Sequence, residues 1–235
     1  MTGRRTAVVT GATRGIGLAV ARSLAAEYRV VMLARNADDL RAAAREIGEA
    51  ACPLPCDLAD SAATEVAIVR IRDLASGAPD VLVNNAGLFK LSPVESTSPD
   101  DFAASLDVNL SAPFRIIRAF LTEMRKRGSG HIVSIGSIAD RMTFPQNGSY
   151  SAAKFGLRGL HQVLRAELRG SGVRSTLVSP GPVDTPLWDE INPDEREGFT
   201  PRSAMLRPED VAAAVLFAVA QPASVNVDEL RLSRS

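Results

Sequence analysis

Short apolar runs alternate with longer amphipathic stretches along almost the whole chain, and this alternation limits the possible folds more than any other feature. Runs rich in Val, Ile and Leu predict six buried strands: Thr6–Thr10, Arg29–Ala34, Ala51–Cys56, Val81–Val83, His131–Ile135 and Val173–Ser179. The amphipathic stretches predict helices: Gly15–Glu27, Ala37–Glu49, Ser61–Ala75, Asp101–Arg127, Ser149–Arg169 and Pro208–Ala220. Strands that alternate with helices build βαβ units with right-handed crossovers. The expected fold class is therefore α/β, a doubly wound parallel sheet in three αβα layers.

Length and charge narrow the choice further. The chain has 235 residues, 46% of them hydrophobic and 23% charged, which suits one α/β domain spanning residues 1–235. Lys and Arg total 27, as do Asp and Glu, so the formal net charge is zero and a nucleic-acid partner is not expected. No apolar run reaches the ~18 residues that span a bilayer, and no signal-type segment precedes the first strand. We therefore expect a cytoplasmic protein without a membrane partner.

The cysteines and histidines do not predict a metal centre. Cys52 and Cys56 lie far in sequence from His131 and His161, whereas a structural zinc site usually needs four ligands. Two cysteines are also too few for a disulfide framework. We expect both to be reduced packing residues.

A glycine-rich turn follows the first predicted strand and opens the first helix. Its glycines allow a tight turn, a close approach of the backbone to a pyrophosphate, and close packing of the helix on the sheet. The free amides and the dipole of the helix N-terminus favour phosphate there. We therefore expect a dinucleotide to bind at Gly11, Thr13, Arg14, Gly15, Ile16 and Gly17.

The end of the second predicted strand indicates which dinucleotide is used. An acidic residue at that point would select NAD through the ribose 2′-hydroxyl, but Ala34 stands there and is followed by Arg35 and Asn36. Arg35 and Arg14 could hold a 2′-phosphate through forked donors. The expectation is NADP(H) in preference to NAD(H), and the alternative is a pair of solvated surface arginines.

Tyr150 and Lys154 are spaced i, i+4 at the start of a predicted helix, so they share one face. A phenol has an ordinary pKa near 10, and a nearby ammonium stabilises the phenolate. Such a pair can exchange a proton with a hydroxyl group while a cofactor moves the hydride.

At this point the chain resembles the short-chain dehydrogenase/reductase family in its short, single-domain form, from Thr6 to about Leu232. The motifs that carry the resemblance occur in family order: Thr10-Gly-x-x-x-Gly-Ile-Gly17, Asn84-Asn-Ala-Gly87, Asn109, Ser137, Tyr150-x-x-x-Lys154 and Pro180-Gly-x-Val183. Each motif is weak alone, but the combination is specific. The resemblance implies a Rossmann-type fold that binds NAD(P).

The resemblance also implies a role for each matching catalytic position. Tyr150 would be the general acid in reduction and the base in oxidation, and Ser137 rather than Ser134 would stabilise charge on the substrate oxygen. Lys154 would lower the tyrosine pKa and hold the nicotinamide ribose. Asn109 would kink its helix and hold a water between Lys154 and solvent, although it could instead be an ordinary polar helix residue.

Further cofactor contacts are implied by segments that follow the later strands. Asp57 and Leu58 resemble the pair that meets the adenine. The ribose would be lined by Asn85, Ala86 and Gly87. The segment that holds the nicotinamide carboxamide would include Pro180, Gly181, Val183 and Thr185.

Two features bear on assembly and on the substrate. Helices 101–127 and 149–169 are apolar on more than one face, and in the family these helices pair between subunits, so we expect a homodimer or homotetramer. The usual glycine-rich family tail is absent, and the end of the chain resembles a branch with a short final strand. The irregular, proline-containing segment Pro186–Arg207 predicts a lid over the substrate. An apolar substrate pocket is expected from Phe89, Ile138, Met142, Phe144 and Trp188.

The function that these features favour is NADP(H)-dependent interconversion of a ketone or aldehyde and its alcohol. An NAD-dependent alcohol dehydrogenase of the same family is the first alternative. A nucleotide-sugar epimerase would need a second lobe, for which the residues after Pro208 leave no room. A cofactor-sensing protein without turnover commonly lacks the serine or the tyrosine, and both are present here.

Overall fold

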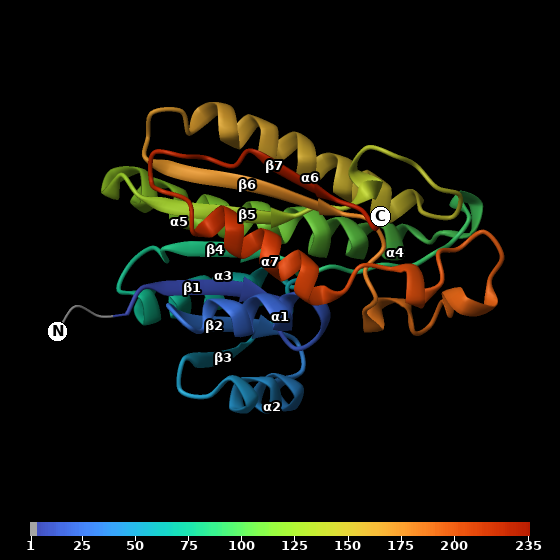
Figure 1. Cartoon of the computed structure of the whole chain (residues 1–235), viewed down its shortest axis with the longest axis horizontal. Helices are drawn as coiled ribbons and strands as arrows, with labels where there is room; N and C mark the ends of the chain where they lie inside the picture. Colours follow the sequence, from blue (N-terminus) through green and yellow to red (C-terminus); the bar gives the residue numbers. More distant parts are fainter. Residues whose placement is uncertain (1–3) are drawn as a thin grey trace.

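The computed structural model describes residues 4–235, and its strands build one parallel sheet (Figure 1). The strands are β1 (Thr6–Thr10), β2 (Arg29–Ala34), β3 (Ala51–Pro55), β4 (Val81–Asn84), β5 (Gly130–Ile135), β6 (Val173–Pro180) and β7 (Glu229–Leu232). Their order across the sheet is β3-β2-β1-β4-β5-β6-β7, and every neighbouring pair is parallel. The doubly wound sheet predicted from the sequence is confirmed.

Helices cover both faces of the sheet (Figure 1). They are α1 (Gly15–Leu24), α2 (Ala37–Ile47), α3 (Ser61–Ala75), α4 (Pro99–Leu106), α5 (Ala112–Arg127), α6 (Gly148–Glu167) and α7 (Pro208–Val219). The cluster of apolar residues on one face joins the strands to α1, α2 and α7. The cluster on the other face joins them to α3, α5 and α6.

The middle strands are buried on both sides, which explains their unbroken apolar sequences. In β1, Ala7 and Val9 belong to the first cluster, whereas Val8 between them belongs to the second. All three side chains are fully buried. Side chains alternate between the two faces of a strand, so both faces must be apolar when helices cover both.

The helix predicted over residues 101–127 is interrupted at Asn109, where the family resemblance implied a kink, and it divides into two helices that the apolar pattern did not separate. α4 ends at Leu106, a π-helical turn spans Asp107–Ser111, and α5 begins at Ala112. Within the turn, Asn109 donates hydrogen bonds from Nδ2 to the carbonyl oxygens of Leu88 (2.8 Å) and Ser105 (2.9 Å). The contact with Leu88 lies outside the helix, so no pattern local to the helix could reveal it.

The sheet order fixes where a ligand can bind. The chain passes from β1 to β2 on one side, and β4 lies on the other side of β1, which makes a switch point at the carboxyl ends of β1 and β4. Residues 186–207 lie beyond that edge, in orange in Figure 1, and form three short 3₁₀ turns at Pro186–Trp188, Pro193–Glu195 and Arg202–Ala204. Within residues 4–235, no helix has the length and apolar character needed to cross a bilayer.

Candidate active site

A cleft of about 880 Å³ runs along the carboxyl ends of the strands. At one end it is lined by the loop between β1 and α1 and by the end of β2. At the other end it is lined by Ser137, Tyr150, Lys154 and part of the 186–207 segment. Two groups of residues that lie far apart in sequence therefore face one continuous space.

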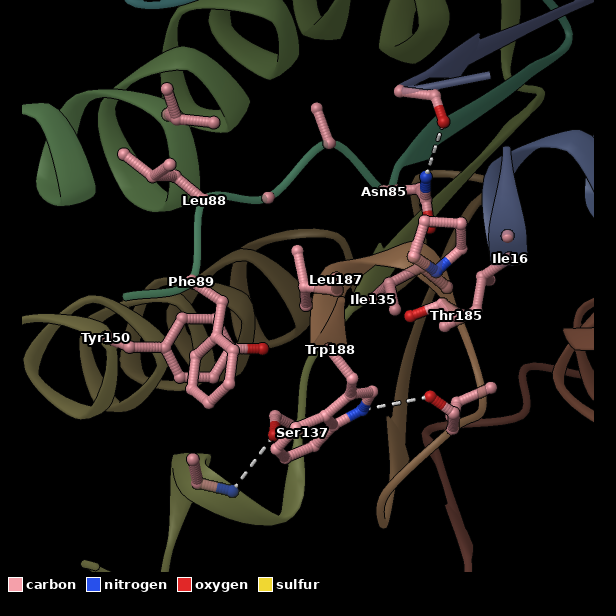
Figure 2. Close-up of a pocket in the computed structure, with 18 of the residues that line it drawn as sticks. Ile16, Asn85, Leu88, Phe89, Ile135, Ser137, Tyr150, Thr185, Leu187 and Trp188 are labelled. Atoms are coloured by element: carbon pink, nitrogen blue, oxygen red, sulfur yellow. Dashed lines mark hydrogen bonds between the residues drawn. The ribbon is translucent and has the colours of Figure 1, made fainter. Parts of the chain in front are cut away.

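Hydrogen bonds between the end of β1 and the segment after β4 hold the floor of this cleft, and Figure 2 draws one made by the Asn85 side chain. The Thr10 hydroxyl accepts hydrogen bonds from the backbone amides of Asn85 and Ala86, each at 2.9 Å. The Asn85 side chain donates from Nδ2 to the Thr10 carbonyl oxygen at 2.8 Å. A Cβ on Gly17 would lie 2.1 Å from the Gly11 carbonyl oxygen, so only glycine lets α1 begin this close to the turn.

The first turn of α1 is suited to an anion. No side chain caps its N-terminus, and its first turn contains no acidic residue. By contrast, the side chains of Asn36, Asp60 and Ser98 cap α2, α3 and α4. The open amides of α1 line the cleft through Gly15 and Ile16, where amides and helix dipole together favour phosphate.

The charged groups at this end of the cleft include one that the sequence analysis missed. Arg14 and Arg35 line the cleft and are exposed, and Asn36 lines it while its Oδ1 accepts from the amides of Asp38 and Asp39. The Asp39 carboxylate belongs to the same wall. Asp39 lies in the first turn of α2, only four residues after Arg35, and this closeness in sequence could have predicted it.

Nearly all the other predicted cofactor residues lie in the cleft wall. These are Gly11, Thr13, Asp57, Leu58, Asn85, Ala86, Gly87, Pro180, Gly181, Val183 and Thr185. Gly17 and Asn109 do not line the cleft and instead support its walls. Gly17 packs against the glycine turn, and Asn109 Oδ1 accepts a hydrogen bond from the amide of Leu88.

Ser137 follows β5 and begins a short turn at Ile138–Asp140. Its Oγ accepts a hydrogen bond from the amide of Ala139 at 3.1 Å, and its own amide donates to Asp140 Oδ2 at 3.3 Å (Figure 2 draws the first of these). This reciprocal capping fixes the serine side chain in the cleft wall. Because one lone pair of the hydroxyl is used by Ala139, the hydroxyl proton can be donated elsewhere.

In the first turns of α6, Lys154 is buried and Tyr150 is half-buried in the cleft wall, and the loss of solvent shifts the pKa of each. Burial raises the pKa of Tyr150 to about 12, while the Ser137 hydroxyl acts in the opposite direction and the Asp140 charge adds to the rise. Burial lowers the pKa of Lys154 to about 8, against the opposing effect of Asp140. The Lys154 ammonium lies 5.4 Å from the centroid of the Tyr150 ring, and Nζ donates to the Ile135 carbonyl oxygen at 2.8 Å.

The expected lowering of the Tyr150 pKa by Lys154 is not seen in the protein without cofactor. With a pKa of about 8, Lys154 has lost its proton well before Tyr150 ionises near pH 12. A neutral amine supplies no positive charge to a phenolate. Tyr150 is therefore a protonated phenol at neutral pH.

Aromatic side chains connect Tyr150 to the 186–207 segment (Figure 2). The Phe89 ring lies 4.9 Å from the Tyr150 ring and 5.2 Å from the Trp188 ring, measured between centroids, and both contacts are edge-on. Trp188 is held by a hydrogen bond of 3.1 Å from Nε1 to the Val183 carbonyl oxygen. Met142, which was expected in this pocket, does not line it and is half exposed.

Comparisons with known proteins place these features in a family. Residues 5–196 match the model of the short chain dehydrogenase family. An uncharacterized oxidoreductase of Staphylococcus aureus strain MW2 is 33% identical, with 95% of this chain and 94% of the relative aligned. D-threitol dehydrogenase of Mycolicibacterium smegmatis is 34% identical over 94% of this chain and 88% of that protein. The crystal structure of a metagenomic short-chain oxidoreductase in complex with NADP superposes with a TM-score of 0.85 at 34% identity, covering 99% of this chain and 98% of that one.

The sheet order, with its cleft at the switch point, makes this a Rossmann-fold protein. Sequence identity above 30% over nearly the whole length shows that the chain shares a family with these relatives, and not only a fold. The chain belongs to the short-chain dehydrogenase family and is an oxidoreductase.

Proposed function

We propose that the protein is an NADP(H)-dependent oxidoreductase that interconverts a ketone or aldehyde and the corresponding alcohol, with Tyr150 as general acid and base. The observation that carries the proposal is that one continuous cleft joins the two groups of residues. It begins at the open N-terminus of α1 and ends at Ser137, Tyr150 and Lys154. One extended dinucleotide could therefore bind its phosphates at the first end and bring its nicotinamide to the second.

The residues present fit such a cofactor. The α1 amides would hold the pyrophosphate, Asp57 and Leu58 the adenine, and the segment after β6 the nicotinamide end. When bound, the nicotinamide supplies or accepts the hydride. The protein supplies the orientation, the exclusion of water and the proton.

Preference for NADP(H) is proposed from the charges at the adenosine end. Arg14 and Arg35 contribute two positive charges to the wall, Asp39 and Asp57 contribute two negative charges, and Ala34 leaves no carboxylate at the end of β2. Two guanidinium groups at the glycine turn and after β2, with no carboxylate at the end of β2 itself, favour a 2′-phosphate over a hydroxyl. The NADP in the related metagenomic oxidoreductase supports this direction.

Each residue at the other end has a chemical task. Tyr150, protonated at neutral pH, would donate its proton to the carbonyl oxygen as the alcohol forms. Ser137 would donate a hydrogen bond to the same oxygen and stabilise charge that develops there. Lys154 would hold the nicotinamide ribose, and Asn109 would keep the π-helical turn in place and position a water leading from Lys154 to solvent.

The pocket around this end favours an uncharged substrate. Its wall is mainly apolar: Leu88, Phe89, Leu91, Ile138, Phe144, Leu187, Trp188 and Phe199. Besides Tyr150 and Lys154, the ionisable side chain that contributes to this part of the described wall is Glu197, which is exposed. No arginine lines this end, so a carboxylate substrate would lack the bidentate partner that usually binds it.

The proposal is tested with NADPH and a panel of carbonyl compounds, following NADPH absorbance. The panel pairs uncharged aliphatic and aromatic ketones and aldehydes with 2-oxo acids and with sugars of similar size. Turnover should be fastest with an uncharged apolar carbonyl. Absence of NADPH binding by calorimetry would overturn the cofactor assignment, and a clear preference for 2-oxo acids would overturn the substrate class.

A homo-oligomer is also proposed. Phe102 on α4, Phe114 on α5 and Phe155 on α6 are each more than 40% exposed, whereas Phe120 on α5 is fully buried. Large aromatic side chains exposed on neighbouring helices are typical of surfaces covered by another subunit. The final strand β7 pairs with β6 through its whole length, so the short tail is part of the sheet.

A further inference from the structure

A buried carboxylate lies directly behind Ser137, and the proposed chemistry gives it no role. Asp140 ends the short turn that Ser137 begins, and none of its surface is exposed. It does not line the cleft. An ionised carboxylate without exposure is stable only where hydrogen bonds and opposite charges replace its water.

Three donors from different directions meet this carboxylate. Asp140 Oδ2 accepts from the Ser179 hydroxyl of β6 at 2.5 Å and from the Ser137 amide at 3.3 Å. Asp140 Oδ1 accepts from Arg141 Nε at 2.7 Å. The carboxylate therefore joins the Ser137 turn to the neighbouring strand.

A second carboxylate continues the chain of charges to the edge of the sheet. Arg141 Nη2 lies 2.7 Å from Glu229 Oε1 on β7, in an ion pair whose arginine side chain is 17% exposed. Asp140, Arg141 and Glu229 together carry one net negative charge. The final strand thus takes part in fixing the active-site turn.

The backbone at Gly136 passes close to the Asp140 carboxylate and the Ser179 hydroxyl. A Cβ on Gly136 would lie 2.6 Å from Asp140 Oδ2 and 2.6 Å from Ser179 Oγ. Real Cβ atoms essentially never come that close, so a side chain at position 136 would displace the Asp140 carboxylate or the Ser179 hydroxyl. The strand end, the hydroxyl and the carboxylate form one packed unit behind Ser137.

We propose that Asp140 is a positioning residue of the active site: it fixes the Ser137 turn against β6 and places a carboxylate behind Tyr150 and Lys154. The catalytic part of this role rests on the function proposed above. The charge raises the pKa of Tyr150 and the pKa of Lys154 alike, so it favours the state in which both carry a proton. That is the state from which a carbonyl can be protonated.

The charged and titratable groups around Asp140 define the expected effect of removing its charge. They are Arg141 beside it, Glu229 on β7, and Tyr150 and Lys154 on α6. Asp140 raises the pKa of both Tyr150 and Lys154, so loss of a proton from either is easier when that negative charge is removed. The variant Asp140→Asn keeps the shape of the side chain and removes the charge.

The test is the titration of Lys154 in the protein without substrate or cofactor. The chain contains three lysines, and Lys90 and Lys126 are exposed, so lysine labelled with carbon-13 at Cε gives a distinct signal for Lys154 with a midpoint at about pH 8. In Asp140→Asn that midpoint should fall by at least about half a pH unit. In Arg141→Gln, which removes the cation beside Asp140, it should rise.

Ser179→Ala is the matched control, because it removes one hydrogen bond from Asp140 and leaves the charge. Its Lys154 midpoint should stay close to that of the wild type. An unchanged midpoint in folded Asp140→Asn, a fall in Arg141→Gln, or an equal fall in Ser179→Ala would overturn the proposal. If Asp140→Asn does not fold, Arg141→Gln decides alone. The titration involves no turnover, so its failure leaves the reductase proposal standing.

Discussion

The protonation state of Tyr150 is set by the loss of solvent around its side chain and not by the charge of Lys154, four residues later. The i, i+4 spacing indicated an ammonium-stabilised phenolate, but burial of both side chains dominates. The pKa of the phenol is raised to about 12 and the pKa of the amine is lowered to about 8. The phenol is therefore ready to donate a proton at neutral pH, and alcohol oxidation would require the bound cofactor to change this balance.

Arg35 provides a direct test of cofactor choice at the scale of one residue. Replacing Arg35 by alanine should weaken NADPH binding about 10- to 100-fold, because a charge-assisted contact with the 2′-phosphate is lost. NADH binding should change little. Titration of wild type and variant with both cofactors gives the four affinities, and equal wild-type affinities for NADPH and NADH would overturn the preference.

Several site residues could be predicted because their signals are local. The glycine turn, the Tyr150–Lys154 spacing and the segments after each strand all led to residues of one cleft wall. Asp140 was missed, although a serine followed three residues later by an acidic residue is a capping pattern that sequence can show. Its links to Ser179 and Glu229 are tertiary and leave no local signal.

At the scale of elements, the 186–207 segment is tied down in several places. Arg202 pairs with Asp184 at 2.8 Å and with Asp189 at 2.6 Å. The backbone amide of Arg202 donates to Asp194 Oδ1 at 2.8 Å. Together with the contact between the rings of Trp188 and Phe199, 6.4 Å apart, these bonds hold the segment beside the cleft.

Replacing Arg202 by alanine should loosen this segment. Cleavage within residues 186–207 by a dilute protease should become roughly two- to fivefold faster, because two ion pairs are lost from partly exposed positions. Fluorescence of Trp188, the single tryptophan, should shift to longer wavelength as its ring becomes wetter. Glu190→Ala in the same segment is the control, since Glu190 is exposed and its side chain forms no ion pair or hydrogen bond within residues 4–235.

Ligand binding should act on the same segment in the opposite direction. Addition of substrate to the NADP complex should change Trp188 fluorescence and slow cleavage, because closure excludes water from the reaction site. If neither signal responds at saturating ligand, or if Arg202→Ala behaves like Glu190→Ala, the segment is a fixed part of the wall and not a lid.

The six strands expected from apolar runs were predicted to within one residue at each end. The seventh, β7, was expected only as a short final strand, and the helical pattern over residues 101–127 did not show the break between α4 and α5. Burial on both faces gives the strands continuous apolar runs that end where the sheet ends, as for β1 and β2. The π-helical turn at Asp107–Ser111 depends on contacts between Asn109 and Leu88, which the helical pattern does not contain. The local sequence indicates whether a segment is a strand or a helix. A break within a helix, such as this π-helical turn, depends on contacts with residues outside the helix.

At the scale of the whole molecule, two buried histidines link stability to pH. His131 on β5 and His161 on α6 are almost fully buried, and burial lowers their pKa values to about 3 and about 4. In the unfolded chain each would titrate near 6.5. Between these values the unfolded state binds more protons, so stability falls as pH decreases below about 6.5.

Urea unfolding between about pH 7 and pH 5 should show this dependence. Each histidine should contribute a loss of roughly 1.4 kcal/mol per pH unit below its unfolded pKa. His161→Leu should remove one such contribution and flatten the curve by that amount. An identical slope in wild type and His161→Leu would show that His161 does not carry the effect.

The role of Tyr150 is tested most directly by Tyr150→Phe. With the fastest carbonyl substrate of the panel, the variant should lose about 10²–10⁴-fold in turnover, because the phenol hydroxyl carries the proton to the substrate oxygen. Its affinity for NADPH should stay close to that of the wild type, since the ring that lines the cleft remains. Near-normal turnover in Tyr150→Phe, with NADPH bound, would contradict the assignment of Tyr150 as the general acid.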